Sequence, residues 1–140
     1  MSEPVKVKKA KAGPPADTPA RRKKQAAHAR GLAAEDRAAA LLEARGFAIL
    51  GRRIRTGAGE LDIVARDERL LVFCEVKLRA DLAQAAESVL PRQRRRIAAA
   101  AEAYLAVNPA LGGLDMRFDA ILLGLDGAAE HLPGAFDADG

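Results

Sequence analysis

The segment 69–79 narrows the choice of fold more than any other part of this chain, because its pattern is that of a strand covered on both faces. Side chains alternate between the two faces of a strand. One face is apolar throughout and consists of Leu70, Val72, Cys74, Val76 and Leu78. The other face begins with Leu71 and Phe73 and becomes polar at Glu75 and Lys77. This pattern predicts a central strand of a layered sheet, whose polar end emerges at a cleft.

The neighbouring segments predict the other layers of this sheet. Apolar spacing and turn residues predict strands over 47–55, 60–66 and 116–125, helices over 31–45 and 91–107, and a short helix or loop over 82–88. Gly46 is expected to stop the first helix, Gly51 to mark a bulge, and a short extended piece to lie near His131. The order helix, three strands, helix, strand predicts a small α/β domain on a central mixed sheet flanked by helices.

Composition and charge divide the 140 residues into a domain and two tails. Residues 1–30 carry nine basic and two acidic residues, a net of +7, whereas residues 31–140 carry fourteen and seventeen, a net of −3. Residues 1–29 combine Lys, Arg, Ala and Pro with almost no large apolar side chain, which predicts a disordered basic tail. It either attracts nucleic acid loosely or is a solubilising extension. The predicted domain spans residues 30–136, and 137–140 form a short C-terminal tail.

The sequence excludes several classes of protein. Cys74 is the only cysteine, so a disulfide framework is ruled out and nothing resembles a Cys/His zinc site. The N-terminus lacks the apolar segment of a signal peptide, and no apolar run approaches the ~20 residues of a membrane span. These features predict a cytoplasmic protein without a membrane partner, in which Cys74 and its apolar neighbours belong to the core.

Acidic and basic side chains gather on the two strands of the central hairpin. Asp62 is expected to lie near Glu75 and Lys77 of the next strand. Two carboxylates can hold a hard divalent cation, and a lysine can orient an attacking water, as phosphodiester hydrolysis requires. The pattern therefore predicts a Mg²⁺ or Mn²⁺ site with Asp62, Glu75 and the Val76 carbonyl as ligands. The alternative is a set of structural ion pairs across the strands.

Two further acids are candidates for supporting positions. Glu35 lies on the apolar stripe of the first helix with Leu32, Ala39 and Leu42, where an unpaired carboxylate would be costly to bury. It is expected to have a cation, a hydrogen-bond donor or a metal ion as its partner. Glu60 precedes Asp62 by two positions and is either a further metal ligand or, as we expect, a supporting residue that binds backbone amides or Arg52 and Arg53.

Arginines gather in two places near this predicted site. One group opens the long helix, where cations oppose the helix dipole, and the other adjoins the Gly-rich turn at 56–59. The candidates for nucleic-acid contact are Arg92, Arg94, Arg95, Arg52, Arg53 and Arg55. The alternative for the helix is a solvated face that pairs with Asp81 or Glu87. Arg117 and Asp119 are expected to form a structural ion pair, and neither His28 nor His131 is expected to be a catalytic base.

Several motifs together resemble the YraN-like family of small bacterial proteins over about residues 30–136. They are Gly31-x-x-x-Glu35-Asp36-x-Ala38, Gly46-Phe47, Gly59-Glu60-Leu61-Asp62, Val72-Phe73-x-Glu75-Val76-Lys77, Pro91-Arg92, Arg117-Phe118-Asp119 and Ala135-Phe136. That family is similar to the restriction-endonuclease-like nucleases of the PD-(D/E)xK type, which include archaeal Holliday-junction resolvases. The resemblance implies an αβββαβ core and assigns the catalytic positions to Glu35, Asp62, Glu75 and Lys77. Leu61 and Gln93-Arg94 depart from the common pattern.

The residues and the resemblance lead to one principal functional expectation. It is a metal-dependent endonuclease acting on DNA rather than RNA, and on branched or structured DNA in particular. A resolvase-like enzyme is also expected to act as a homodimer. The alternatives are a non-catalytic nucleic-acid-binding protein that retains the fold, and a structural protein whose acidic cluster only stabilises it.

Overall fold

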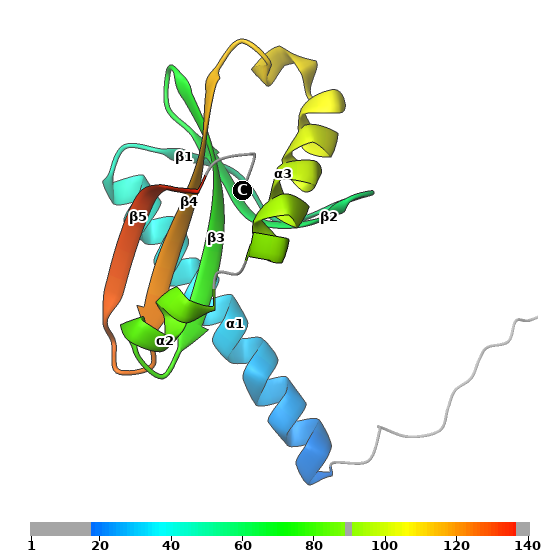
Figure 1. The fold of residues 1–140 in the computed structure, drawn as a ribbon. Coiled ribbons are helices and arrows are strands. Elements are labelled where there is room, and N and C mark those ends of the chain that lie inside the picture. The colour runs from blue at the N-terminus through cyan, green and yellow to red at the C-terminus, as the bar shows by residue number, and fades with distance from the viewer. Residues whose placement is uncertain (1–17, 89–90, 137–140) are drawn as a thin grey trace, which may run out of the picture. The chain divides into compact units, whose positions relative to one another are not determined.

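Five strands form one sheet in the order β1-β2-β3-β4-β5, and the computed structural model describes residues 18–88 and 91–136 (Figure 1). The strands are β1 (Ala48–Thr56), β2 (Gly59–Arg66), β3 (Leu70–Arg79), β4 (Asp115–Gly124) and β5 (Ala129–Phe136). The pair β3–β4 is parallel and all other pairs are antiparallel. A parallel pair needs a long crossover, which here contains α2 (Leu82–Glu87), α3 (Pro91–Ala106) and the 3₁₀ turn η1 (Pro109–Leu111). The predicted α/β class and mixed sheet are confirmed.

The first helix, α1 (Pro19–Ala44), begins twelve residues earlier than the predicted start at residue 31. The Thr18 hydroxyl accepts a hydrogen bond of 3.1 Å from the backbone N–H of Arg21, and Pro19 takes the first helical position. The prediction of disorder is thus wrong for residues 19–29, because it weighed apolar content and neglected the helix propensity of Ala, Arg and Lys. Residues 1–17 of the predicted tail lie outside the described part of the chain.

The chain divides into two units, residues 1–30 and residues 31–140. In the first unit, all described residues are exposed. In the second, α1 ends where Gly46 adopts a left-handed φ of 95°, as a helix stop requires. The other predicted helix and strand bounds agree with the structure to within one residue, and a register shift between Ile49 and Gly51 confirms the predicted bulge.

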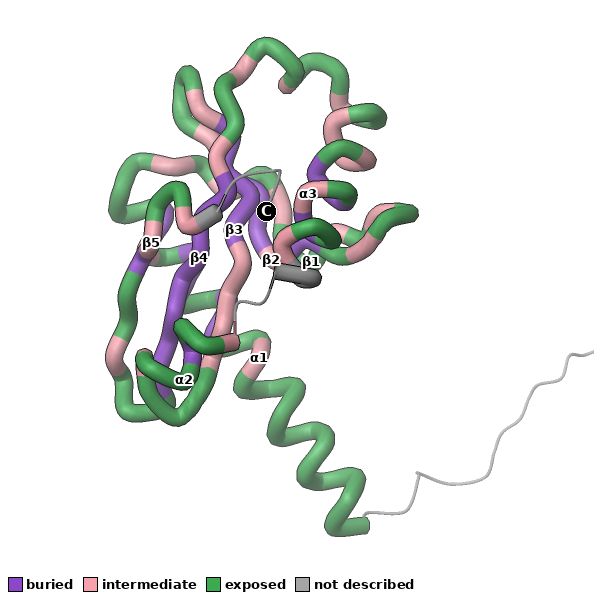
Figure 2. The backbone as a smooth tube through the Cα atoms, in the orientation of Figure 1, coloured by how far each residue is buried: buried purple, intermediate pink, exposed green. Residues whose placement is uncertain are grey.

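The sheet of the second unit is covered on both faces, as the pattern of β3 predicted. Its buried residues are concentrated on the inner strands β2, β3 and β4 (Figure 2). One face packs against the C-terminal part of α1 through Ala34, Ala38, Ala39 and Leu42. The other packs against α3 through Ile97, Ala100 and Ala101. Phe73 lies on the α3 side, stacked on Phe118 with ring centroids 5.7 Å apart. Leu32, by contrast, is 39% exposed and lies outside the core.

The extended piece predicted near His131 is a full edge strand, β5. Pro133 and Gly134 hid its length in the sequence, because both residues are unfavourable inside strands. Gly134 has a φ of 62°, and the pairing of β4 with β5 is irregular between Phe118 and Ala120, so the strand accommodates both residues at a bulge. No helix in the ranges 18–88 and 91–136 has the length and apolar content needed to cross a bilayer.

Candidate active site

Asp62 lies where β2 separates from β3. The β2–β3 ladder runs from Arg66↔Leu71 to Ile63↔Cys74 and ends one residue before Asp62. Beyond that point the Asp62 carboxylate takes the place of a strand carbonyl, because its Oδ2 accepts a hydrogen bond of 2.8 Å from the backbone N–H of Val76. The opening between the two strands therefore holds a carboxylate in a fixed position.

The regular alternation of side chains along β2 is interrupted at this same point. Leu61 packs on the α3 side of the sheet, whereas Ile63 packs on the α1 side, although residues two apart in a regular strand share a face. On the neighbouring strand, Arg53 lies between the paired residues Arg52 and Ile54 and has a left-handed φ of 50°. Such a backbone is strained for a residue with a side chain and is typical of functional sites. The distortion separates Asp62 from the regular ladder.

Glu75 and Lys77 lie together on the polar end of β3. The Lys77 Nζ is 2.8 Å from Glu75 Oε2, and the two side chains are only 12% and 13% exposed. This ion pair forms between residues two apart on one strand, as the alternation of side chains allows. It places a cation beside a carboxylate at the edge of the opening.

These residues line one cavity of about 280 Å³, which we call the carboxylate cavity. Its lining residues are Glu60, Asp62, Glu75, Val76, Lys77, Arg96 and Ile97. β2 and β3 contribute the carboxylates and the lysine, and α3 contributes Arg96 and Ile97. The structure thus brings together the four side chains that sequence analysis selected on the two strands. It also adds Arg96, which was not among the predicted site residues.

The carboxylates of this cavity influence one another. Burial, followed by the charge of Glu75, raises the pKa of Asp62 to about 7, and the charge of Glu35 adds to the rise. The hydrogen bond from the Val76 N–H and the charge of Lys77 act in the opposite direction. Two carboxylates in a partly buried site repel each other unless a proton or a cation intervenes.

Glu35 is buried on α1, 7% exposed, and has the partner that its position required. The Arg53 Nε donates a hydrogen bond of 2.8 Å to Glu35 Oε1, and Arg52 lies 3.8 Å from the same oxygen. Arg52 also pairs with Asp36 at 2.8 Å. Glu35 does not line the carboxylate cavity among its described residues, although its charge reaches Asp62.

The arginines predicted to contact nucleic acid are distributed over several places. Arg52 and Arg53 are engaged by the acids of α1, and Arg55 is exposed, in register with Glu60. Arg94 is partly buried on α3, and the side chain of Arg92 lies outside the described part of the chain.

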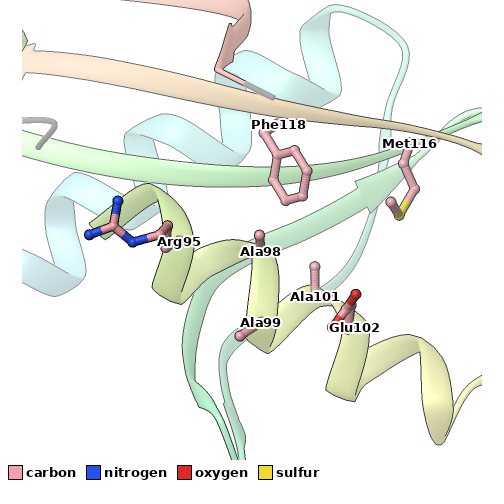
Figure 3. Close-up of a pocket in the computed structure, with 7 residues that line it drawn as sticks. All are labelled: Arg95, Ala98, Ala99, Ala101, Glu102, Met116 and Phe118. Carbon is pink, nitrogen blue, oxygen red and sulfur yellow. The ribbon is translucent and has the colours of Figure 1, made fainter. Parts of the chain in front are cut away.

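Arg95 lines a second cavity, of about 300 Å³, between α3 and β4 (Figure 3). None of the predicted arginines with a described side chain lines the carboxylate cavity. Arg96 lines the carboxylate cavity. The run of arginines at 92–96 indicated a basic surface, but it did not show which arginine of the helix faces the strands.

A second polar cluster lies between β4 and β5. The predicted Arg117–Asp119 ion pair is confirmed, with N–O distances of 2.7 and 2.9 Å. His131 Nε2 lies 2.7 Å from Asp119 Oδ2, and Arg45 Nη1 lies 2.7 Å from His131 Nδ1. Since arginine only donates, His131 must accept at Nδ1 and donate at Nε2. Burial alone would raise the pKa of Asp119, but these partners and the Gly134 N–H hold it below its usual value.

The remaining candidates for chemistry are few. Cys74 is buried, and burial together with the charge of Asp119 holds the pKa of its thiol well above its usual range. A reactive thiolate is therefore disfavoured there. Within residues 18–88 and 91–136, no group of three or more His, Cys, Asp or Glu side chains has an arrangement suited to a metal ion. Asp62 and Glu75 are the pair of carboxylates available in the carboxylate cavity, with exposed Glu60 beside them.

Comparison with known proteins gives one consistent family. Residues 34–123 match the family described as Uncharacterised protein family UPF0102. A UPF0102 protein of Azorhizobium caulinodans is 73% identical over 127 residues, which cover 91% of this chain and 97% of that protein. A UPF0102 protein of Rhodopseudomonas palustris strain HaA2 is 52% identical over 113 residues, covering 81% and 88% of the two chains. The matched range includes every residue that lines the carboxylate cavity.

Proposed function

The chain belongs to the uncharacterised protein family UPF0102, and from the geometry of its carboxylate cavity we propose that it is a divalent-metal-dependent endonuclease that hydrolyses phosphodiester bonds in DNA. The observation that carries the proposal is the carboxylate cavity, in which Asp62 and Glu75 lie with Lys77 and Arg96. Mutual repulsion of the two carboxylates gives the fold no stability of its own. A site that is to hold a hard cation, by contrast, needs such a pair.

The oxygen donors of the cavity suit Mg²⁺ or Mn²⁺. Asp62 and Glu75 would bind the ion through carboxylate oxygens, and two protein carboxylates are typical of Mg²⁺, which keeps several waters. The Val76 carbonyl is a further candidate, because the N–H and C=O of one strand residue point to the same edge and the Val76 N–H points to Asp62. When bound, the ion would neutralise charge on the phosphate and lower the pKa of a bound water.

The other residues of the proposed site have separate roles. Lys77, fixed 2.8 Å from Glu75, would orient the nucleophilic water and stabilise the charge that develops on the phosphoryl oxygens. Glu35 would support the site indirectly by binding Arg53, and Glu60 would lie next to the two metal-binding carboxylates. The exposed basic residues of the 19–30 segment of α1 would attract the DNA backbone.

The likeness of the motifs to the YraN-like family supports a finer proposal. In this finer proposal the protein is a nuclease of the PD-(D/E)xK type, and its substrate is branched or structured DNA, as for Holliday-junction resolvases. A non-catalytic DNA-binding protein is the second candidate. The observation that favours it is the exposed basic segment 19–30 of α1, which would attract nucleic acid without a metal ion.

The first test is cleavage of a panel of DNA substrates by the full chain with Mg²⁺ or Mn²⁺. The panel contains plasmid, linear duplex, flap, four-way junction and single strand. We expect the native protein to cut at least one substrate and Asp62→Asn to lose 10²-fold or more of that rate, since removal of one electrostatic catalytic group typically costs this much. Asp115→Asn, an exposed change at the start of β4, is the matched control and should cut normally.

The outcomes of this test separate the candidates. If the native protein and Asp62→Asn bind DNA equally and neither cuts any substrate, the non-catalytic binding protein is the better proposal. If both cut equally, the activity lies outside the carboxylate cavity or belongs to a contaminant.

A further inference from the structure

Arg96 is the cation on the α3 wall of the carboxylate cavity, opposite the strands that contribute the carboxylates. Its guanidinium makes no ion pair or hydrogen bond with any residue that the structure describes, although three acids line the same cavity. Arg52, Arg53 and Arg117, in contrast, each bind a carboxylate within 2.8 Å. The cavity therefore has an arginine on its α3 side and carboxylates on its strand side, with open space between them.

Gly59 explains how Arg96 comes to lie there. A Cβ atom added to Gly59 would lie 3.2 Å from Arg96 Cγ and 3.5 Å from its Cδ, so the arginine stem passes directly over the glycine. Gly59 also has a φ of 146°, which side-chain-bearing residues rarely adopt. Its conformation therefore favours glycine at this position, and a side chain there would also crowd the stem of Arg96. Gly57, in the same turn, has nothing within 4 Å of the corresponding position.

We propose that Arg96 binds a phosphate of the DNA strand that enters the carboxylate cavity, and that Gly59 provides the space in which its side chain is positioned. A guanidinium can bind two phosphate oxygens at once, which fixes the orientation of the group as well as its place. The phosphate would lie between Arg96 and the carboxylate pair. This inference rests on the proposed function, because it assumes that nucleic acid enters the cavity.

The position of Arg96 distinguishes it from its neighbour in the sequence. Arg95 lines a different cavity, together with Ala98, Ala99, Ala101, Glu102, Met116 and Phe118 (Figure 3). No carboxylate of β2 or β3 lines that cavity among the described residues. Of these two arginines, only Arg96 lies where a phosphate would also meet Asp62 and Glu75.

The test measures binding in a form that does not depend on cleavage. Asp62→Asn protein is titrated with a fluorescent duplex in EDTA, and the association constant is followed by anisotropy at several NaCl concentrations. Adding Arg96→Gln should weaken binding and reduce the slope of log K against log[salt] by about one, the loss of one phosphate contact. Arg96→Lys, which keeps a point charge, should retain the slope. Arg69→Gln, an exposed change in the turn before β3, should alter neither quantity.

The outcomes distinguish this proposal from the nuclease proposal. An unchanged affinity and slope in Arg96→Gln overturns the role of Arg96, even if the native protein cuts DNA. A reduced slope supports the role of Arg96, even if the native protein cuts nothing and the nuclease proposal fails.

Gly59 is tested in a double-mutant cycle with Arg96. Gly59→Ala should weaken DNA binding in the Arg96 protein and have no further effect on binding in the Arg96→Gln protein, because the guanidinium group that the added methyl group would displace is absent there. The unfolding temperature should fall in both backgrounds, since the φ of 146° strains alanine in either. Gly57→Ala is the matched control and should leave binding unchanged. Equal losses of affinity in both backgrounds would contradict a link between Gly59 and Arg96.

Discussion

Asp62 links the candidate site to the stability of the fold, because ionisation of its carboxyl group costs free energy in the folded protein. Burial and the charge of Glu75 raise the pKa of Asp62 to about 7, above the usual 3.8. The folded protein therefore binds a proton more tightly than the unfolded chain, and this contribution to stability is complete below pH 3.8 and lost as the pH rises through about 7. The native protein without metal should become less stable between pH 5 and pH 8 for this reason.

Asp62→Asn should remove that dependence, because asparagine has no charge to bury. Without metal, we expect the variant to melt about 2–4 °C above the native protein at pH 8, the shift that about 1 kcal/mol produces in a domain of similar size. The difference should shrink at pH 5, where Asp62 is itself protonated. Thermal unfolding by circular dichroism measures it, with Asp115→Asn as a control that should follow the native protein. A lower melting temperature for Asp62→Asn at pH 8 would contradict the predicted charge repulsion.

At the scale of elements, a buried polar cluster links β5 to the rest of the sheet, in addition to its backbone pairing with β4. Asp119 of β4 receives hydrogen bonds from Arg117, from His131 of β5 and from the Gly134 N–H. His131 in turn accepts from Arg45, which follows α1. The cluster thus joins the end of a helix, an inner strand and an edge strand whose own pairing is interrupted. The sequence predicted the Arg117–Asp119 pair of this cluster, but Arg45 and His131 are 86 residues apart, so no local pattern revealed their part in it.

His131→Ala should therefore loosen β5 selectively. The change removes a donor from a fully buried carboxylate, which typically costs roughly 1.5–3 kcal/mol for a hydrogen bond to a charged group. Urea unfolding should show this loss, and hydrogen exchange should show the largest loss of protection in the amides of 129–136. Glu130→Ala alters an exposed neighbour on the same strand and should have little effect. Uniform loss of protection across the sheet would argue against a local role for the cluster.

At the scale of the whole molecule, the sequence was sufficient where structure follows from local periodicity. The alternation in β3 predicted a central strand, and with it the layers on either side and the meeting of Asp62 with Glu75 and Lys77. Contacts that depend on how α3 lies over the sheet could not be predicted, because a helical run of arginines does not show which member faces the strands. Arg96 and its neighbour Gly59 were missed for this reason. The early start of α1 was missed because propensity, not burial, forms that segment.

Whether the carboxylate cavity is a metal site can be decided on the intact molecule without any substrate. A cation that binds only the folded protein stabilises it by about 2.7 kcal/mol at 100 times its Kd, a rise in Tm on the order of 10 °C. We expect Mn²⁺ or Mg²⁺ to produce such a rise at pH 8. The effect should be much smaller in Asp62→Asn and Glu75→Gln, and smaller in the native protein at pH 5.5, where protons compete for Asp62.

This measurement also separates a metal site from an acidic cluster that only stabilises the fold. A metal site predicts that the apo protein is strained at pH 8 and that the cation relieves the strain through the same two carboxylates. Asp115→Asn should keep the full rise in Tm, since Asp115 is exposed and does not line the cavity. An equal rise in the native protein and in both cavity variants would place the cation elsewhere. No rise in the native protein would leave Asp62 and Glu75 without a metal ion, and the proposed hydrolysis would then lack its source of an activated water.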